Sequence, residues 1–216
     1  MAAVPAQPKI YHITHVRNLA QIVAAGRLWS DAKRIEMSLD CALVGMSEIK
    51  RRRLEELEVA CHPGTKVGQY VPFYFCPRSI MLYILHRGNN PDLSYRGGQR
   101  PIVHLRADLH ETVRLGDEHG ARWAFTTGNA GTRYASFYDS LDRLNEVNWA
   151  AVEARDFRNP AIKEGKQAEF LVFGSFPWSL VERIGVIDAA RLKQVQAVLA
   201  RAEHQPCVRV ERRWYF

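Results

Sequence analysis

Short apolar runs alternate with polar, turn-forming segments along the whole chain. Runs rich in apolar, β-branched and aromatic residues predict short strands, at residues 10–13, 71–75, 101–105, 170–173, 185–187 and 208–210. Apolar positions three and four residues apart predict helices, at residues 18–25, 47–59, 79–87, 137–155, 177–183 and 189–202. The sequence contains no internal repeat and no low-complexity linker, so this order predicts a single α+β domain spanning residues 1–216.

Cap residues indicate where several of these helices begin and end. Gly26 follows the helix of residues 18–25, at the position where a glycine commonly ends a helix. Ser47 is suited to be the N-cap of the helix of residues 47–59. That helix is polar over most of its circumference, so we expect it to lie on the surface or to line a cleft.

The segment from Gly116 to Ser136 is predicted to be a long loop rich in Gly, Asn and Thr. Its aromatic residues are interleaved with cationic and polar residues, among them Thr127, Asn129 and Arg133. Aromatic faces beside cations can stack single-stranded bases, which is one interpretation of this loop. A loop that packs on its own aromatic residues is the alternative.

Charge narrows the choice of partner. The 216 residues carry 30 Lys and Arg against 23 Asp and Glu, a net charge of +7. This balance favours a polyanionic partner such as nucleic acid, although a basic surface also serves solubility alone. No apolar run is long enough for a transmembrane helix, and the N-terminus lacks the pattern of a secretory signal, so we expect a cytoplasmic protein. No long apolar stripe is left without a partner, so we expect a monomer.

The cysteines do not indicate a disulfide framework or a metal site. Cys41, Cys61, Cys76 and Cys207 are scattered, and no C-x-x-C pair occurs. Cys61 is followed by His62, but two adjacent ligand types are too few to predict a metal. We therefore expect no metal.

Glu169 stands at the polar beginning of the apolar run of residues 170–173, where a charge can face a cleft. On an extended backbone the side chain of Gln167 points the same way, because successive side chains alternate between the two faces. This pair is a candidate catalytic constellation. A solvated glutamate at a strand end is the alternative.

Two further clusters can bind phosphate or ribose groups. His12 and Thr14 share one face of the first predicted strand and offer two hydrogen-bonding side chains, unless His12 is a core residue satisfied by backbone. The run Lys50–Arg53 suits phosphate recognition, but consecutive helical positions point in different directions, so one or two of these side chains can face a given site. A surface helix neutralised by its own glutamates is the alternative. Phosphate-loop, dinucleotide-fold and zinc-protease motifs are absent from the sequence.

Four sequence blocks occur in the order found in one family. They are Tyr11–His15 with Asn18–Leu19 and Gly26–Leu28; Val71–Phe75 with Pro77–Ser79 and Met81–Tyr83; Thr127–Ala130; and Gln167–Val172. Together these blocks, which cover about residues 10–190, resemble the DarT toxins, the DNA ADP-ribosyltransferases of DarT–DarG toxin–antitoxin pairs. Ile80 stands where the family typically has proline, a change that touches no candidate catalytic group.

The resemblance implies an ADP-ribosyltransferase fold, in which two small, roughly orthogonal β-sheets flanked by helices form a split that holds NAD. Residues 33–53 would be a lid over NAD, and residues 128–169 would hold the loop that meets DNA. The residues implied to bind NAD are His12, Ile13, Thr14, Asn18, Gln21, Leu28 and Arg51. The residues implied to bind the substrate are Gln167, Thr127, Asn129 and Arg133.

The resemblance also implies a reaction. The family uses a catalytic Glu, here Glu169, and one Arg of the lid helix; Arg51 is favoured here, and Arg52 after it. The expected activity is transfer of ADP-ribose from NAD to a base in single-stranded DNA, most often thymine, by a toxin that blocks replication and is paired with a macrodomain antitoxin of the DarG type. The alternatives are an enzyme of the same fold that modifies guanine, RNA or protein, and a non-catalytic module that binds single strands.

Overall fold

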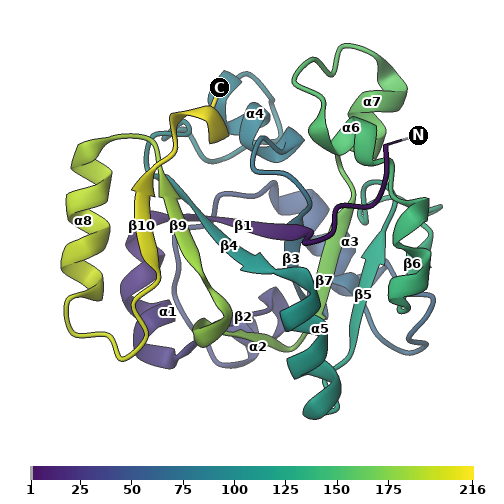
Figure 1. Cartoon of the computed structure of the whole chain (residues 1–216), viewed down its shortest axis with the longest axis horizontal. Coiled ribbons are helices and arrows are strands. Elements are labelled where there is room, and N and C mark those ends of the chain that lie inside the picture. The colour runs from purple at the N-terminus through teal and green to yellow at the C-terminus, as the bar shows by residue number, and fades with distance from the viewer. Residues whose placement is uncertain (1) are drawn as a thin grey trace.

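The structure is a computed structural model that describes residues 2–216, with strands and helices distributed along the whole of that range (Figure 1). The strands are β1 (Lys9–His15), β2 (Arg27–Trp29), β3 (Tyr70–Tyr74), β4 (Ile102–Asp108), β5 (Trp123–Thr126), β6 (Phe137–Tyr138), β7 (Glu169–Phe173), β8 (Ser175–Pro177), β9 (Arg183–Val186) and β10 (Cys207–Val210). The α-helices are α1 (Leu19–Ala25), α2 (Asp31–Glu36), α3 (Ser47–Glu55), α4 (Ile80–Arg87), α5 (Leu109–Glu118), α6 (Trp149–Glu153), α7 (Pro160–Gly165) and α8 (Ala189–Leu199). The predicted α+β class is confirmed.

One residue pair joins the two halves of the main sheet. Within residues 2–216 the strands form an eight-stranded sheet, in the order β10-β9-β4-β1-β3-β7-β5-β6, and a two-stranded sheet of β2 and β8. At the centre, β1 and β3 are paired through Tyr11 and Tyr74 alone, whereas β1 and β4 are paired along their whole length. In Figure 1, β1 runs across the view and β7 and β5 run up it. The sheet therefore behaves as two four-stranded halves that separate on either side of the Tyr11–Tyr74 pair, as the family fold implies.

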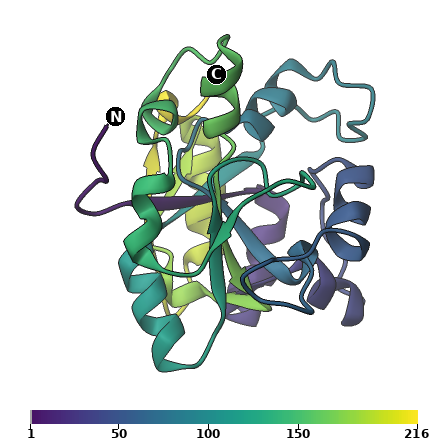
Figure 2. The same ribbon diagram turned by 90° about the vertical axis from the view of Figure 1, so that its right-hand side faces the viewer.

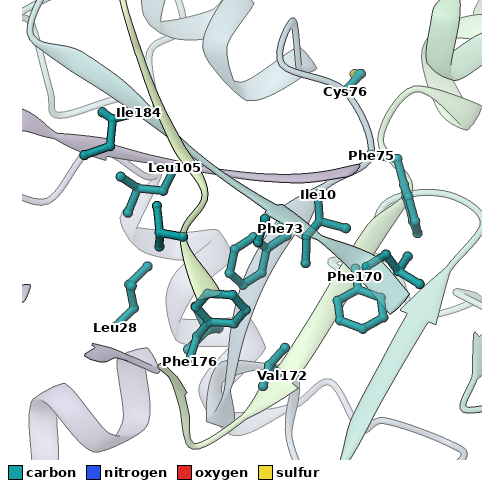
Figure 3. Close-up of a cluster of buried hydrophobic side chains, with 14 of the residues drawn as sticks. Ile10, Leu28, Phe73, Phe75, Cys76, Leu105, Phe170, Val172, Phe176 and Ile184 are labelled. Atoms are coloured by element: carbon teal, nitrogen blue, oxygen red, sulfur yellow. The ribbon is translucent and has the colours of Figure 1, made fainter. Parts of the chain in front are cut away.

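A buried apolar core holds the two halves together beneath this junction. Ile10, Phe73, Phe170 and Phe176 are fully buried and come from β1, β3, β7 and β8 (Figure 3). The rings of Phe73 and Phe176 pack with centroids 4.6 Å apart, which fastens the small sheet to the large one. Full burial of each such side chain contributes about 1.5–3 kcal/mol. The core thus fixes β3 and β7, the strands that carry Tyr74 and Glu169.

The predicted helix ends are met in part. Gly26 ends α1 with φ of 63°, a left-handed conformation that favours glycine, as predicted. Ser47 is the first residue of α3 rather than its N-cap, which is Met46, and α3 ends at Glu55 instead of residue 59. The predicted helix of residues 47–59 is too long because Leu57 and Val59 are buried by a turn that pairs the Val59 amide with the Thr65 carbonyl.

The prediction that residues 116–136 are all loop is wrong. The segment begins with the last turn of α5 and includes β5, whose four residues are all buried and which is paired with β7. The aromatic and apolar run of β5 fits a buried strand, but the surrounding Gly, Asn and Thr residues obscured it. The loop is thereby shortened to residues 127–136.

Two predicted helices are largely not α-helical. Residues 137–155 contain β6, a 3-10 helix (Leu141–Glu146) and the short α6, whose N-cap Asn148 starts a new helix. Residues 177–183 contain a 3-10 turn (Trp178–Leu180) that leads into β9. In residues 137–155 the capping side chain of Asn148 interrupts the helical pattern. In residues 177–183 the pattern is too short for more than a single turn.

All the α-helices except α5 fall into three groups around the sheet. Figure 1 places α1 and α8 beside β9 and β10, and α6 and α7 at the other end of the sheet. In Figure 2, the segment containing α2 and α3 lies on one side of the sheet together with α4. Among residues 2–216 no helix combines the length and the apolar character needed to cross a bilayer.

Candidate active site

A cavity of about 260 Å³ opens where β1 and β3 diverge. Its lining comes from β1, α1, β2, β3, α4 and β7, from the 127–136 loop, and from the segment that begins with α2 and ends with α3. The residues predicted to bind NAD that line it are His12, Ile13, Thr14, Asn18, Gln21 and Leu28. Glu169, Gln167 and Asn129 line the same cavity, so the structure brings most of the predicted site together.

Glu169 is held by a two-pronged ion pair with Arg53. Arg53 Nη1 and Nη2 donate to Glu169 Oε1 and Oε2 over 3.1 and 2.9 Å. The side chain of Glu169 is 3% exposed and that of Arg53 is 14% exposed. Burial alone would lower the pKa of Arg53, but the adjacent carboxylate raises it above its usual value. Arg53 is therefore charged, and its planar guanidinium fixes the orientation of the Glu169 carboxylate.

Backbone and hydroxyl groups also position Glu169. The Ala130 amide donates to Glu169 Oε1 over 3.2 Å. The Glu169 amide donates to Thr126 Oγ1, which in turn donates to the Gly128 carbonyl over 2.7 Å. The start of the 127–136 loop is thereby tied directly to the carboxylate at the beginning of β7.

Tyr74 is the neighbour of Glu169 across the β3–β7 pairing. Its side chain lines the cavity between the two halves of the sheet. Burial, and then the Glu169 charge, raise the pKa of Tyr74, so the phenol stays protonated at neutral pH. Tyr74 therefore offers a neutral hydroxyl beside the Arg53–Glu169 pair.

His12 enters the cavity as a neutral imidazole. Its Nδ1 lies 2.8 Å from the Pro72 carbonyl, an acceptor, so Nδ1 carries the proton. Burial lowers the pKa of His12, and the bond to Pro72 offsets only part of that effect. Nε2 is then an acceptor for a ligand that enters the cavity, because a neutral imidazole has one donor and one acceptor nitrogen.

Asn18 joins the beginning of α1 to the covering segment, the predicted lid of residues 33–53. Its Oδ1 accepts from the Ala42 amide over 2.8 Å, and its Nδ2 donates to the Ala42 carbonyl over 3.1 Å. Nδ2 also lies 3.1 Å from Thr14 Oγ1, its acceptor on β1. The carboxamide of Asn18 is thus engaged mainly in holding residues around Ala42 over the cavity.

A second ion pair closes the covering segment from the other side. Lys50 Nζ on α3 donates to both carboxylate oxygens of Asp31 on α2, at 2.9 Å each. Burial raises the pKa of Asp31, but the positive charges of Lys50 and Arg34 lower it by more. The net shift of the pKa is therefore downward. Asp31 stays ionised. Its ion pair with Lys50 joins α2 to α3, the two helices at the ends of the covering segment.

Gln167 and Asn129 form an amide pair at the edge of the cavity. Asn129 Nδ2 donates to Gln167 Oε1 over 3.3 Å, and Gln167 Nε2 donates to the Lys163 carbonyl over 3.2 Å. Both side chains lie where the 127–136 loop meets the end of α7. Amide groups placed here can contact the edge of a nucleobase beside Glu169.

Arg51 and Arg52, the lid arginines favoured from the sequence, lie outside the cavity lining. Arg51 is exposed and bound by Glu48, Glu55 and Glu56, with hydrogen bonds of 2.7–3.2 Å. Arg52 reaches Glu56 at 3.6 Å. Arg53, which was not favoured from the sequence, is the arginine that contacts Glu169.

Helical periodicity indicates which of the three arginines of α3 faces the cavity. Positions three and four apart share a helix face, so Arg53 lies on the face of Ile49 and Lys50, and all three line the cavity. Arg51 lies instead on the face of Glu48 and Glu55. Two other predicted residues, Thr127 and Arg133, belong to the 127–136 loop and lie outside the cavity lining, with Arg133 exposed.

Comparisons with known proteins agree with this architecture. A sequence model described as "ssDNA thymidine ADP-ribosyltransferase, DarT" matches residues 11–216. A DNA ADP-ribosyl transferase of Thermus aquaticus is 39% identical over 216 residues, which cover 99% of this chain and 91% of that protein.

Two solved structures of DarT from Thermus sp. 2.9 superimpose over nearly the full length of both chains. The complex with ADP-ribosylated single-stranded DNA has a TM-score of 0.88 at 33% identity, covering 100% of this chain and 99% of that chain. The complex with NAD+ has a TM-score of 0.79 at 32% identity, covering 99% and 100%.

The fold and these matches define the class of protein as a DNA ADP-ribosyltransferase. Within that class, the chain belongs to the DarT family. The resemblance inferred from the four sequence blocks is confirmed, as is the ADP-ribosyltransferase fold.

Proposed function

We propose that this enzyme transfers ADP-ribose from NAD to thymine in single-stranded DNA and acts as the toxin of a toxin–antitoxin pair. The observation that carries the proposal is the buried Glu169 carboxylate, fixed by Arg53 and the Ala130 amide inside a cavity of about 260 Å³. The solved complexes of DarT from Thermus sp. 2.9 with NAD+ and with ADP-ribosylated single-stranded DNA support the two substrates. The thymidine specificity in the description of the family model supports the base.

NAD is the co-substrate, and the cavity offers groups for its nicotinamide and ribose ends. His12, Ile13 and Thr14 at the divergence of β1 and β3 are proposed to hold the nicotinamide end. Gln21 and Leu28 form the wall beyond them, and Asn18 keeps the covering segment closed over the dinucleotide. The covering segment excludes water, which otherwise competes with the base for the activated sugar.

Glu169 stabilises the charge that develops on the sugar. The bond from ribose C1′ to nicotinamide breaks with its electron pair going to nicotinamide, and positive charge builds on the ribose. A carboxylate beside the ribose stabilises this charge, and one well-placed group of this kind contributes about 3–4 kcal/mol. The Arg53 fork and the Ala130 amide hold Glu169 in a fixed orientation before the reaction.

The nucleobase then forms the new bond. A ring nitrogen of thymine bonds to C1′, and the proton that this nitrogen carried passes to solvent. Arg53 is too basic to accept that proton, since arginine stays charged in proteins. We assign Arg53 the catalytic role that was expected of Arg51 or Arg52. Arg53 stabilises the anionic character of the base as the proton leaves, while it keeps Glu169 in place.

The substrate strand is proposed to approach from the side of the 127–136 loop. Gln167 and Asn129 present neutral amides next to Glu169, which suits hydrogen bonding to a base edge. On the loop itself, Arg133 is exposed and the ring of Tyr134 is 95% exposed. An exposed ring and cation can stack and pair with an unpaired strand, which also avoids the cost of flipping a base from a duplex. Thr127 lies at the base of the same loop.

The acceptor is tested with NAD carrying a label on the adenylate half. Matched oligonucleotides that contain all four bases, lack thymine or lack guanine are incubated as single strands and as duplexes, with RNA of the same sequence alongside. The proposal predicts label on single strands that contain thymine and none on strands that lack it. Label on thymine-free strands that disappears when guanine is removed assigns the guanine alternative, and label only on RNA or protein rejects DNA as the acceptor.

The toxin role is tested in cells. Induced wild-type protein is expected to arrest DNA replication, and Glu169→Gln at the same expression level is expected to permit growth. Co-expression of a macrodomain hydrolase of the DarG type, the proposed antitoxin, is expected to restore growth. Arrest that persists in Glu169→Gln would reject a toxicity that depends on ADP-ribosyl transfer.

A further inference from the structure

A second cluster of reactive side chains lies outside the NAD cavity. Cys61 and His62 lie in the turn between α3 and the 3-10 helix Val67–Gln69, and Asp139 directly follows β6. One ligand atom from each residue, a thiol sulfur, a ring nitrogen and a carboxylate oxygen, lies within 4.8 Å of the other two. None of the three residues lines the cavity that holds Glu169.

The imidazole of His62 is held by a backbone carbonyl and by an aromatic ring. Its Nε2 lies 2.8 Å from the Trp123 carbonyl, an acceptor, so Nε2 carries the proton and Nδ1 has the free lone pair. The ring also stacks against Tyr70 at an interplanar angle of 15°. A histidine that ligates a metal typically donates its other N–H to a backbone carbonyl in this manner, which fixes both tautomer and ring orientation.

The turn that carries Cys61 and His62 is itself well held. The His62 amide donates to the Val59 carbonyl over 2.8 Å, and Thr65 Oγ1 donates to the His62 carbonyl over 2.7 Å. Asp139 is exposed, so its carboxylate can rotate toward the other two groups at small cost. Two ligands are thus preorganised and the third is adjustable.

We propose that Cys61, His62 and Asp139 form a binding site for a divalent cation of the zinc type, with water as the fourth ligand. Thiolate, imidazole and carboxylate are the ligand types zinc prefers, and bonds of about 2.0–2.3 Å place the ligand atoms of a tetrahedral site roughly 3–4 Å apart. The observed spacing therefore needs only small side-chain movements. Binding exchanges the proton of the Cys61 thiol for the metal, and the proton goes to solvent.

The metal would connect two segments that flank the reaction site. Cys61 and His62 follow the lid helix α3, and Asp139 follows β6, which is the strand at the end of the 127–136 loop. A bound dication would compensate the negative charge of Asp139. It would also fix the end of the 127–136 loop against the turn that carries Cys61 and His62.

No sequence pattern indicates this site, because Asp139 is distant from Cys61 and His62 along the chain. Pairing of β6 with β5 places Asp139 beside the strand whose Trp123 carbonyl contacts His62. An adjacent Cys and His are too few to predict a metal, which is why none was expected. The fold supplies the third ligand.

The test uses the purified full chain, freed of metal by a chelator and then titrated with zinc or cobalt(II). We expect one zinc per chain, retained against a weak chromophoric chelator, and a cobalt complex with a thiolate-to-metal absorption band.

Cys61→Ser should abolish the band, whereas Cys207→Ser, which removes an exposed thiol elsewhere, should preserve it. Asp139→Asn should weaken zinc binding by about tenfold or more, a loss of the size seen when groups around a metal site are removed. Asp142→Asn, a nearby exposed carboxylate, should bind zinc as the wild type does.

The result is interpreted only for variants whose circular dichroism and melting temperature in chelator match those of the wild type. If Cys61→Ser fails this criterion, Asp139→Asn carries the test because its side chain is exposed. Failure of the wild type to bind stoichiometric zinc overturns the proposal. A cobalt band that survives Cys61→Ser, or zinc binding unchanged in Asp139→Asn, also overturns it. None of these readouts depends on ADP-ribosyl transfer, so the proposal stands or fails independently of the proposed function.

Discussion

Arg53 and Glu169 are joined by two parallel hydrogen bonds, of 3.1 and 2.9 Å, that connect helix α3 to the beginning of β7. This pair links the segment that covers the cavity with the strand that carries the carboxylate. The same helix is tied to α2 by Lys50 and Asp31. A displacement of α3 would therefore remove the guanidinium from Glu169, so the position of this helix and the orientation of the carboxylate are coupled.

Replacing Arg53 is expected to impair transfer far more than replacing Arg51. Arg53→Lys keeps the charge but loses the planar fork, and we expect kcat/KM to fall on the order of a hundredfold, as when one electrostatic group is removed from an active site. Arg51→Lys affects only ion pairs that are screened by solvent and lie outside the cavity lining, so its activity should stay within about threefold of wild type. Steady-state transfer to a thymine-containing single strand measures both variants.

The opposite ranking would return the catalytic role to Arg51. Thermal unfolding controls for stability, because a buried carboxylate that loses its partner costs about 3–5 kcal/mol. An Arg53→Lys variant that folds as the wild type does and transfers at the wild-type rate would contradict the electrostatic role of Arg53.

Asn18 is expected to act mainly through the covering segment. Asn18→Ala removes two hydrogen bonds to the Ala42 backbone, each worth about 1 kcal/mol, so opening of this segment should increase about thirtyfold. Amide hydrogen exchange around Ala42 measures the opening, and the KM for NAD should rise more than kcat falls. Asn89→Ala, at an exposed position, is the matched control. Unchanged exchange around Ala42 would contradict the anchoring role.

His104 makes stability depend on pH. Burial lowers its pKa to about 4, and Nε2 is bonded to the Pro77 carbonyl. The unfolded chain takes up a proton near pH 6.5, which the folded protein does not until about pH 4. This group therefore lowers the free energy of unfolding as pH falls from about 6.5 to about 4, by about 3 kcal/mol in total.

Buried carboxylates contribute in the same pH range, so the effect is measured as a difference. His104→Gln keeps a donor for Pro77 and does not titrate, and its loss of stability between pH 7 and pH 4.5 should be smaller than that of the wild type. His110→Gln, at an exposed histidine, should follow the wild type. Parallel curves for wild type and His104→Gln would show that His104 does not control this dependence.

The sequence predicted the fold best where local signals agreed with burial. The strand at residues 170–173 is an apolar run, and Gly26 ends α1 in the conformation that glycine favours. The prediction failed at β5, where a buried strand lies inside a segment rich in turn-forming residues. Pairing with β7, which only the folded chain provides, decides that conformation.

The predicted site was incomplete for a related reason. His12 and Thr14 could be predicted to lie together because a strand places them on one face, and both line the cavity. The choice among three consecutive arginines depends on the rotation of α3 about its axis, and the face bearing Ile49 would have indicated Arg53. Tyr74 and the Ala130 amide meet Glu169 through strand pairing and loop closure, which no local pattern records.

The role of Glu169 is tested most sharply by single-turnover transfer of ADP-ribose from NAD to a thymine-containing single strand, measured beside equilibrium NAD binding. Glu169→Gln keeps the shape of the side chain and removes its charge. We expect a rate at least about a hundredfold lower, with NAD affinity within about threefold of wild type, because the carboxylate acts on charge that exists only in the transition state. Transfer by Glu169→Gln at the wild-type rate would show that the carboxylate does not stabilise the sugar cation.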